Sequence, residues 1–168
     1  RKVVRARGEH ECEDEIAALW ELPDAVARVD AAARLYAGHP GDARIAYEYA
    51  GAHDSAGDEA VAVPLYEEAL AAGLREPHRH RAQLQLASSL RNVGRLDEAL
   101  AVVEDVTARH PDNLGAAAFR ALVRHDAGGA TEALSELLVS VAATSGDPDV
   151  VRYRRALAAY AAELRDRA

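Results

Sequence analysis

Residues 80–111, HRAQLQLASSLRNVGRLDEALAVVEDVTARHP, carry the clearest structural pattern in this sequence. The stretch divides at Gly94 into two helical segments, and His110 and Pro111 stop the second one. Alanine and leucine recur in both segments, and small alanine side chains let the backbones of packed helices approach closely. A single hairpin of this kind cannot bury its own apolar side. We therefore expect it to stack against neighbouring hairpins.

The glycine turn of this hairpin recurs along the chain at a nearly constant spacing. Gly57, Gly94 and Gly128 each precede an alanine-rich segment with acidic residues, and the intervals between them are 37 and 34 residues. A period of about 34 residues with a glycine turn in the middle is typical of helix–turn–helix repeats. The sequence therefore predicts several copies of one helical hairpin.

The periodic unit resembles the tetratricopeptide repeat, which has large and small apolar residues at fixed positions around its glycine. From His80 onward these positions hold Leu86, Ala87, Leu90, Gly94, Ala99, Val103, Val106 and Pro111. From Ala43 onward they hold Tyr49, Ala50, His53, Gly57, Ala62, Tyr66 and Ala69, with Leu74 in place of the proline. A third unit from Leu114 is degenerate, because Arg120 occupies a leucine position. The resemblance covers residues 42–145 and implies an all-α fold, an α-solenoid of stacked antiparallel helix hairpins with about nine helices.

Turn signals between the helices give the expected boundaries. Residues 1–10 read as a flexible tail, and residues 11–168 as one tetratricopeptide-like domain. Within it we expect a capping hairpin at 11–41, repeats at 42–76 and 77–111, a degenerate repeat at 112–146 and a capping helix at 147–168. An end unit needs a polar outer face, so the apolar residues of the last helix, including Val151 and Tyr160, are expected to pack inward.

Composition limits the environments in which the chain is expected to act. The formal net charge of −8 favours solubility and disfavours binding to nucleic acid or an anionic membrane. No apolar run approaches the roughly 20 residues that a membrane span needs. Cys12 is the only cysteine, so the chain cannot form an internal disulfide. We therefore expect a cytoplasmic location.

The resemblance also implies where a partner would bind, because the first helix of each tetratricopeptide hairpin lines a concave groove. The predicted groove residues are Arg44, Tyr47, Arg81, Leu84, Gln85, Ser88, Arg91 and Arg124. Arginine suits carboxylate or phosphate partners, since its planar guanidinium binds them in bidentate geometry. The same arginines could instead form ordinary ion pairs within the protein. Tyr47 could contact a peptide or simply pack at the rim of the groove.

No motif in the sequence points to chemistry. The adjacent His10, Glu11 and Cys12 make a poor tetrahedral metal site, and His78 and His80 are interpreted as part of a solvated turn. No phosphate-binding glycine loop or zinc knuckle occurs. We expect no catalytic residue, cofactor or metal, and the chain is not expected to be an enzyme. The expected function is a protein–protein interaction scaffold that binds a peptide or an acidic protein surface; the alternative is a self-associating structural module, such as a homodimer.

Overall fold

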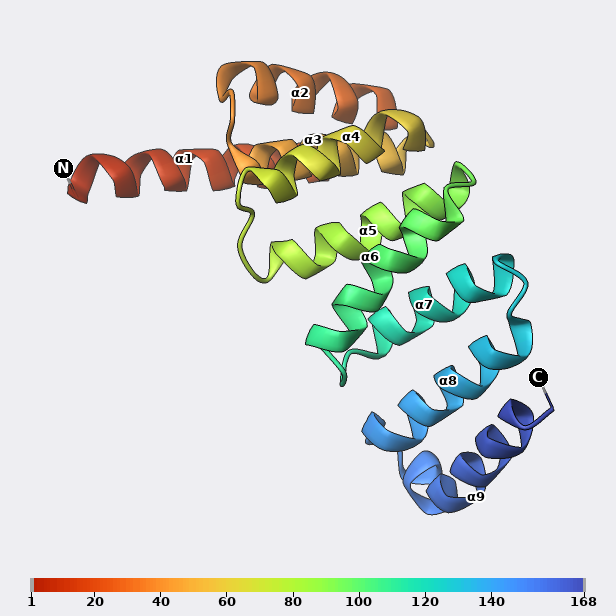
Figure 1. The fold of residues 1–168 in the computed structure, drawn as a ribbon. Coiled ribbons are helices and arrows are strands. Elements are labelled where there is room, and N and C mark those ends of the chain that lie inside the picture. The colour runs from red at the N-terminus through yellow and green to blue at the C-terminus, as the bar shows by residue number, and fades with distance from the viewer. Residues whose placement is uncertain (1, 168) are drawn as a thin grey trace. The chain divides into compact units, whose positions relative to one another are not determined.

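The fold consists of helices joined by short turns (Figure 1). The computed structural model describes residues 2–167, with side chains from residue 12 onward. The nine helices of this described part are α1 (Lys2–Glu21), α2 (Ala25–Gly38), α3 (Ala43–Ser55), α4 (Glu59–Ala71), α5 (His78–Asn92), α6 (Leu96–Arg109), α7 (Leu114–Asp126), α8 (Ala130–Thr144) and α9 (Pro148–Arg165). Residues 2–167 contain no strand, which confirms the predicted all-α class.

Local sequence explains where the helices begin and end. The Asp42 carboxylate accepts hydrogen bonds from the backbone N–H groups of Arg44 (2.9 Å) and Ile45 (3.0 Å), so it caps the start of α3. The Asn113 side chain caps α7 in the same way. Gly57 and Gly94 close the turns after α3 and α5 with positive φ angles of 83° and 82°, a conformation that glycine adopts without steric cost. These capping residues and turn glycines can all be recognised in the sequence, and they account for the ends of the helices that they flank.

The chain divides into two compact units, Arg1–Ala82 and Gln83–Ala168, with the boundary inside α5. In the first unit α3 packs against both α2 and α4. The interface between α3 and α4 is lined by fully buried residues, including Ala50, Ala62 and Tyr66. A second cluster joins Leu19 of α1 and Ala32 of α2 to α3. Each hairpin in this unit is therefore completed by its neighbour, as the alanine-rich pattern predicts.

The second unit follows the same rule, with α6 against α7, α7 against α8 and α8 against α9. Ala99, Val103 and Val106 form the buried side of α6. The Ser135 hydroxyl of α8 donates a 2.6 Å hydrogen bond to the backbone carbonyl of Ala161 in α9, which ties the last hairpin together. Both units have the architecture of stacked antiparallel hairpins that defines the α-solenoid class.

Two expectations at the chain ends are wrong. The first helix was expected from Glu11 but begins at Lys2, so most of the expected tail at 1–10 is helical. Gly8 is the weakest helix former in α1, and a single glycine costs too little to stop a helix. In α9, Val151 and Tyr160 are 48% and 59% exposed rather than packed inward. Only α8 covers α9 in the described part of the chain, so one side of it has no neighbour.

None of the described helices is both long and apolar enough to cross a membrane.

Candidate functional site

The eight predicted groove residues divide between the two units. The first unit holds Arg44, Tyr47 and Arg81, and the second holds Leu84, Gln85, Ser88, Arg91 and Arg124. Arg81 is exposed, whereas the other seven are half-buried. Each unit therefore carries its own part of the predicted set.

A buried carboxylate organises the α3 surface in the first unit. Glu48 is 5% exposed and accepts hydrogen bonds from the indole N–H of Trp20 (2.6 Å) and from Nε of Arg44 (2.8 Å). A second nitrogen of Arg44 pairs with Glu13 of α1 at 2.6 Å. The Trp20 ring covers Gly51, where an added Cβ would lie 3.3 Å from the ring. The Arg44 guanidinium is thus held between two carboxylates, so α1 and α3 are joined by a charged network.

An aromatic pair with a nearby cation lies beside this network, because Tyr47 is three residues from Arg44 and shares its face of α3. Tyr47 of α3 and His78 at the start of α5 have ring centroids 5.6 Å apart, and Tyr66 of α4 lies 6.2 Å from Tyr47. The positive charge of Arg81 acts on both Tyr47 and His78. Arg81 itself forms no ion pair or side-chain hydrogen bond with any described residue. These residues combine apolar contact area with an uncompensated guanidinium.

His78 belongs to this group although no sequence pattern indicates it, and the interpretation of a solvated turn was wrong for it. The side chain is half-buried, and its Nδ1 atom is buried without a hydrogen-bond partner. Burial, followed by the charge of Arg44, lowers the pKa of His78 below its ordinary value of 6.5. The imidazole is therefore neutral at pH 7 and packs against Tyr47 as an uncharged ring.

Acidification is expected to destabilise the protein partly through His78. Its pKa is lower in the folded state than in the unfolded chain, so below pH 6.5 the unfolded chain binds the proton first. The stabilisation that the neutral ring provides is complete above that pH and is lost as the pH falls. Urea unfolding of His78→Gln should therefore show a smaller loss of stability from about pH 7 to about pH 5 than the unchanged protein. Parallel pH profiles for the two proteins would contradict this assignment.

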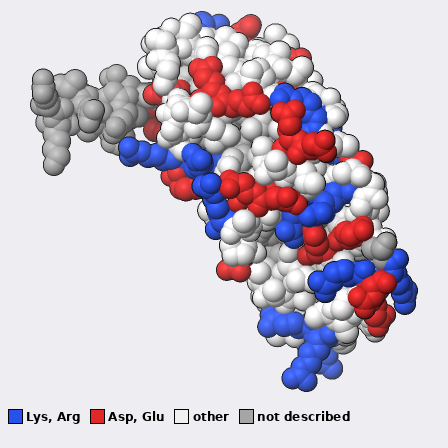
Figure 2. Space-filling view, viewed as in Figure 1, with Lys and Arg blue, Asp and Glu red and all other residues white. Residues whose placement is uncertain are grey.

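In the second unit the predicted groove arginines are paired. Arg91 of α5 contacts Asp126 of α7 at 2.6 Å. Arg124 of α7 contacts Glu104 of α6 at 2.6 Å and Glu136 of α8 at 2.9 Å. On the face drawn in Figure 2, acidic and basic side chains lie next to one another over much of the described surface. Arg91 and Arg124 therefore form ion pairs within the protein, as the alternative interpretation of these arginines expects.

Leu84, Gln85 and Ser88 complete the predicted set on the first helix of the second unit. They are half-buried, and the side-chain oxygen of Gln85 is buried without a hydrogen-bond partner. Gln83, one of their neighbours, is turned away from them and donates a 3.0 Å hydrogen bond to Asp105 of α6. No cation other than Arg91 from the predicted set lies on this helix within the second unit.

Comparison with known proteins identifies the family. Residues 43–164, well over half of the chain, match the family model described as tetratrico peptide repeat. No curated protein matches the chain in sequence. The family match covers both predicted full repeats and the degenerate one, which were placed at residues 42–146.

Solved structures show the same fold at low sequence identity. YrrB, a TPR protein with an unusual peptide-binding site, has a TM-score of 0.64 and 18% identity over 78% of this chain and 66% of YrrB. The chain thus spans about two thirds of that protein. MamA 41-end from Desulfovibrio magneticus RS-1 has a TM-score of 0.67 and 17% identity over 94% of this chain and 91% of that one. The MamA RS-1 ArsTM double mutant has a TM-score of 0.66 and 15% identity, with 94% of both chains covered. From the family match and the repeated hairpins together, the chain belongs to the tetratricopeptide repeat family.

Proposed function

We propose that this protein is a non-enzymatic protein–protein interaction scaffold, and that its first unit binds an acidic peptide or protein surface at Tyr47, His78 and Arg81. The fold supports the general role, because stacked helix hairpins expose long helical surfaces for partner binding. Folds do not dictate function, so the partner chemistry rests on the residues of the site.

The observation that carries the proposal is the unpaired state of Arg81. Arg44, Arg91 and Arg124 are each engaged by carboxylates of the protein itself, at 2.6 Å in every case. Arg81 is exposed and has no such partner among the described residues. A carboxylate or phosphate of a partner can therefore bind its guanidinium without first displacing an internal acid.

The neighbouring rings supply the apolar part of the site. Tyr47 and His78 are both half-buried, which fixes their positions while leaving one part of each accessible. Tyrosine and arginine are enriched among the residues that contribute most to binding energy in protein interfaces. We therefore expect the best ligand to place an apolar or aromatic side chain on these rings and a carboxylate near Arg81.

The test is selection from a displayed peptide library, followed by affinity measurements on charge variants. Selected peptides should be enriched in Asp and Glu, and Arg81→Glu should weaken their binding by about tenfold or more, because attraction becomes repulsion at the contact. Arg75→Glu is the matched control: it makes the same charge change at another exposed arginine without an ion pair, and it should retain the affinity. Selection without acidic enrichment, or equal loss in both variants, would contradict the proposal.

The exposed surface of α9 favours self-association as a second candidate function. Tyr153 and Tyr160 are 55% and 59% exposed, and their spacing of seven residues places them on the same side of the helix. Exposed aromatic side chains that share one side of a helix are suited to contact a second copy of the chain. Light scattering separates the two functions, since a chain that stays monomeric at high concentration does not use α9 for self-association.

A further inference from the structure

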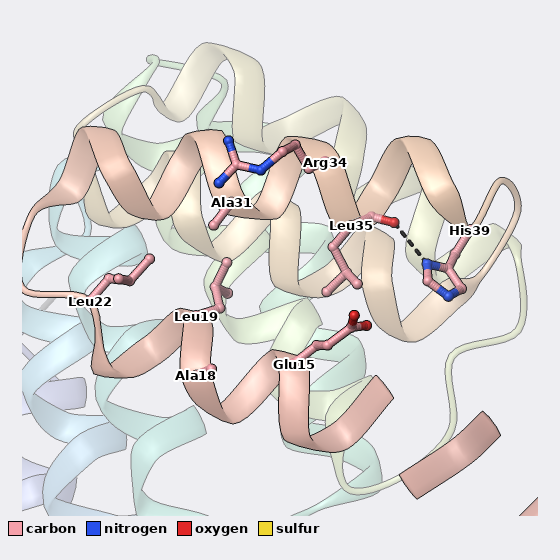
Figure 3. Close-up of a pocket in the computed structure, with 8 residues that line it drawn as sticks. All are labelled: Glu15, Ala18, Leu19, Leu22, Ala31, Arg34, Leu35 and His39. Atoms are coloured by element: carbon pink, nitrogen blue, oxygen red, sulfur yellow. Dashed lines mark hydrogen bonds between the residues drawn. The ribbon is translucent and has the colours of Figure 1, made fainter. Parts of the chain in front are cut away.

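An apolar pocket lies between α1 and α2 in the first unit, outside the predicted groove (Figure 3). Its volume is about 410 Å³. The residues that line it are Glu15, Ala18, Leu19, Leu22, Ala31, Arg34, Leu35 and His39. All of them come from α1, α2 or the residues that directly follow these helices, so no other described helix covers the pocket.

Most of the α1 residues that line the pocket face away from α3, and Leu19 lies at its inner end. On α1, Leu19 packs in the buried cluster with Ala52 of α3, and the polar side chains that reach α3 are Glu13 and Trp20. At 3.6 residues per turn, Glu15, Ala18 and Leu22 lie on the opposite side of the helix from these two. The hairpin of α1 and α2 therefore has one apolar face closed by α3 and a second that remains open. A capping hairpin was expected to have a polar outer face, and this part of it is apolar instead.

The shape and composition of the pocket suit an incoming helix. Two neighbouring helices supply its walls, with lining residues three or four apart on each, as in a groove that accepts a helix. Ala18 and Ala31 are small, so a third helix can approach closely between them. Leu19, Leu22 and Leu35 provide apolar contact below it. Elsewhere in the described residues, α3 packs between α2 and α4, and α7 packs between α6 and α8.

The rim of the pocket carries two opposite charges on opposite walls. Glu15 stands on the α1 wall and Arg34 on the α2 wall (Figure 3). Both are exposed, and neither forms an ion pair or side-chain hydrogen bond with a described residue. His39 is already engaged, because its Nδ1 atom lies 2.9 Å from the Leu35 carbonyl oxygen and can only donate to it. The rim charges without a partner among residues 12–167 are therefore one carboxylate and one guanidinium.

We infer that this pocket docks an amphipathic α-helix of a partner protein. The apolar face of the helix rests on Leu19, Leu22 and Leu35. A basic side chain along one edge meets Glu15, and an acidic side chain along the other edge meets Arg34. This recognition is independent of Tyr47 and Arg81, since those residues lie on other helices and line no part of the pocket.

The probes are three fluorescein-labelled helical peptides with one leucine face and different edges: lysine on one edge and glutamate on the other, lysine on both, or glutamate on both. Fluorescence anisotropy should show that the unchanged protein binds the mixed peptide best, by about threefold at low salt, as expected for exposed ion pairs. A mixed peptide can dock in either direction, so this comparison does not depend on its orientation. Arg34→Glu should shift the preference to the lysine peptide, and Glu15→Lys to the glutamate peptide.

Leu35→Asp tests the apolar floor and should reduce binding of the mixed peptide at least about tenfold. Val26→Asp is the matched control, because Val26 lies on the same helix, is 67% exposed and does not line the pocket. Arg81→Glu should leave the peptide affinity unchanged, which separates this inference from the proposed function. Absence of binding to all three peptides, or equal effects of Leu35→Asp and Val26→Asp, would overturn the inference. A dimer seen by light scattering that Leu35→Asp dissociates would do so too, because it would identify a second copy as the occupant.

Discussion

Replacing Tyr66 with alanine is expected to lower the free energy of unfolding by about 3–5 kcal/mol, the range found when large buried aromatic side chains are truncated. Tyr66 is 0% exposed and is the largest fully buried side chain among the described residues. It lies on α4 against α3, where its ring is 6.2 Å from that of Tyr47. Alanine would leave a cavity between the two helices, where buried residues such as Ala50, Ala62 and Ala69 have side chains too short to fill it.

Urea unfolding followed by the fluorescence of Trp20, the only tryptophan, measures this effect in the first unit. Tyr66→Phe is the control, because it keeps the ring and removes only the hydroxyl that donates a 3.2 Å hydrogen bond to Asp54. Burial and the charge of Asp54 raise the pKa of Tyr66, so the hydroxyl stays protonated and remains a donor. The control should lose about 1 kcal/mol. Equal losses for the two variants would show that the hydrogen bond, not the ring volume, determines the stability.

The residues that carry the repeat pattern are the part of the fold that sequence predicts best. Ala62, Tyr66 and Ala69 of one repeat are fully buried, and so are Ala99 and Val103 of the next. The reason is physical. A residue that packs against both its hairpin partner and the next hairpin must have a side chain of a particular volume. Residues of that size therefore recur at the same position of each repeat.

The ends of the chain were predicted less well, because periodicity shows that a helix has an apolar stripe but not which neighbour covers it. Val151 and Tyr160 were both expected to pack inward, yet they lie on opposite sides of α9 and both remain exposed. The pocket between α1 and α2 has the same origin, since Leu22 and Leu35 continue an apolar pattern on a side where no described helix follows. The expectation of polar end units came from a general rule for repeat proteins, whereas the end helices of this chain expose apolar side chains.

The candidate site shows a different limit. Sequence placed Tyr47 and Arg81 correctly on helices that begin hairpins, but it could not say which arginines find internal partners. The pair between Arg124 and Glu104 joins residues 20 positions apart on different hairpins, so it depends on how those hairpins pack. His78 was missed because its neighbours in sequence are polar, whereas its neighbour in space is Tyr47. Which charged groups pair with one another therefore depends on the tertiary packing of the helices, which a repeat pattern in the sequence does not reveal.

Replacing Glu48 with alanine is the second large effect, with an expected loss of about 2–3 kcal/mol in the free energy of unfolding. The variant leaves the Trp20 indole N–H without its acceptor at 2.6 Å and removes the carboxylate 2.8 Å from Nε of Arg44. Both donors are partly buried, so water replaces the lost carboxylate only incompletely. The loss is smaller than for a fully isolated charge, because Arg44 keeps Glu13 as a partner.

Glu13→Ala is the matched control for Glu48→Ala, since both carboxylates contact the same arginine but differ in burial. The Glu13 side chain is 59% exposed against 7% for Glu48, so its pair with Arg44 is screened by water. Its removal should cost less than about 1 kcal/mol in the same urea experiment. Glu48→Gln should fall between the two, because the amide oxygen can still accept one of the two hydrogen bonds. If Glu13→Ala were as destabilising as Glu48→Ala, the burial of Glu48 would not be the source of the effect. The link between α1 and α3 would then depend on the surface pair rather than on the carboxylate beneath Trp20.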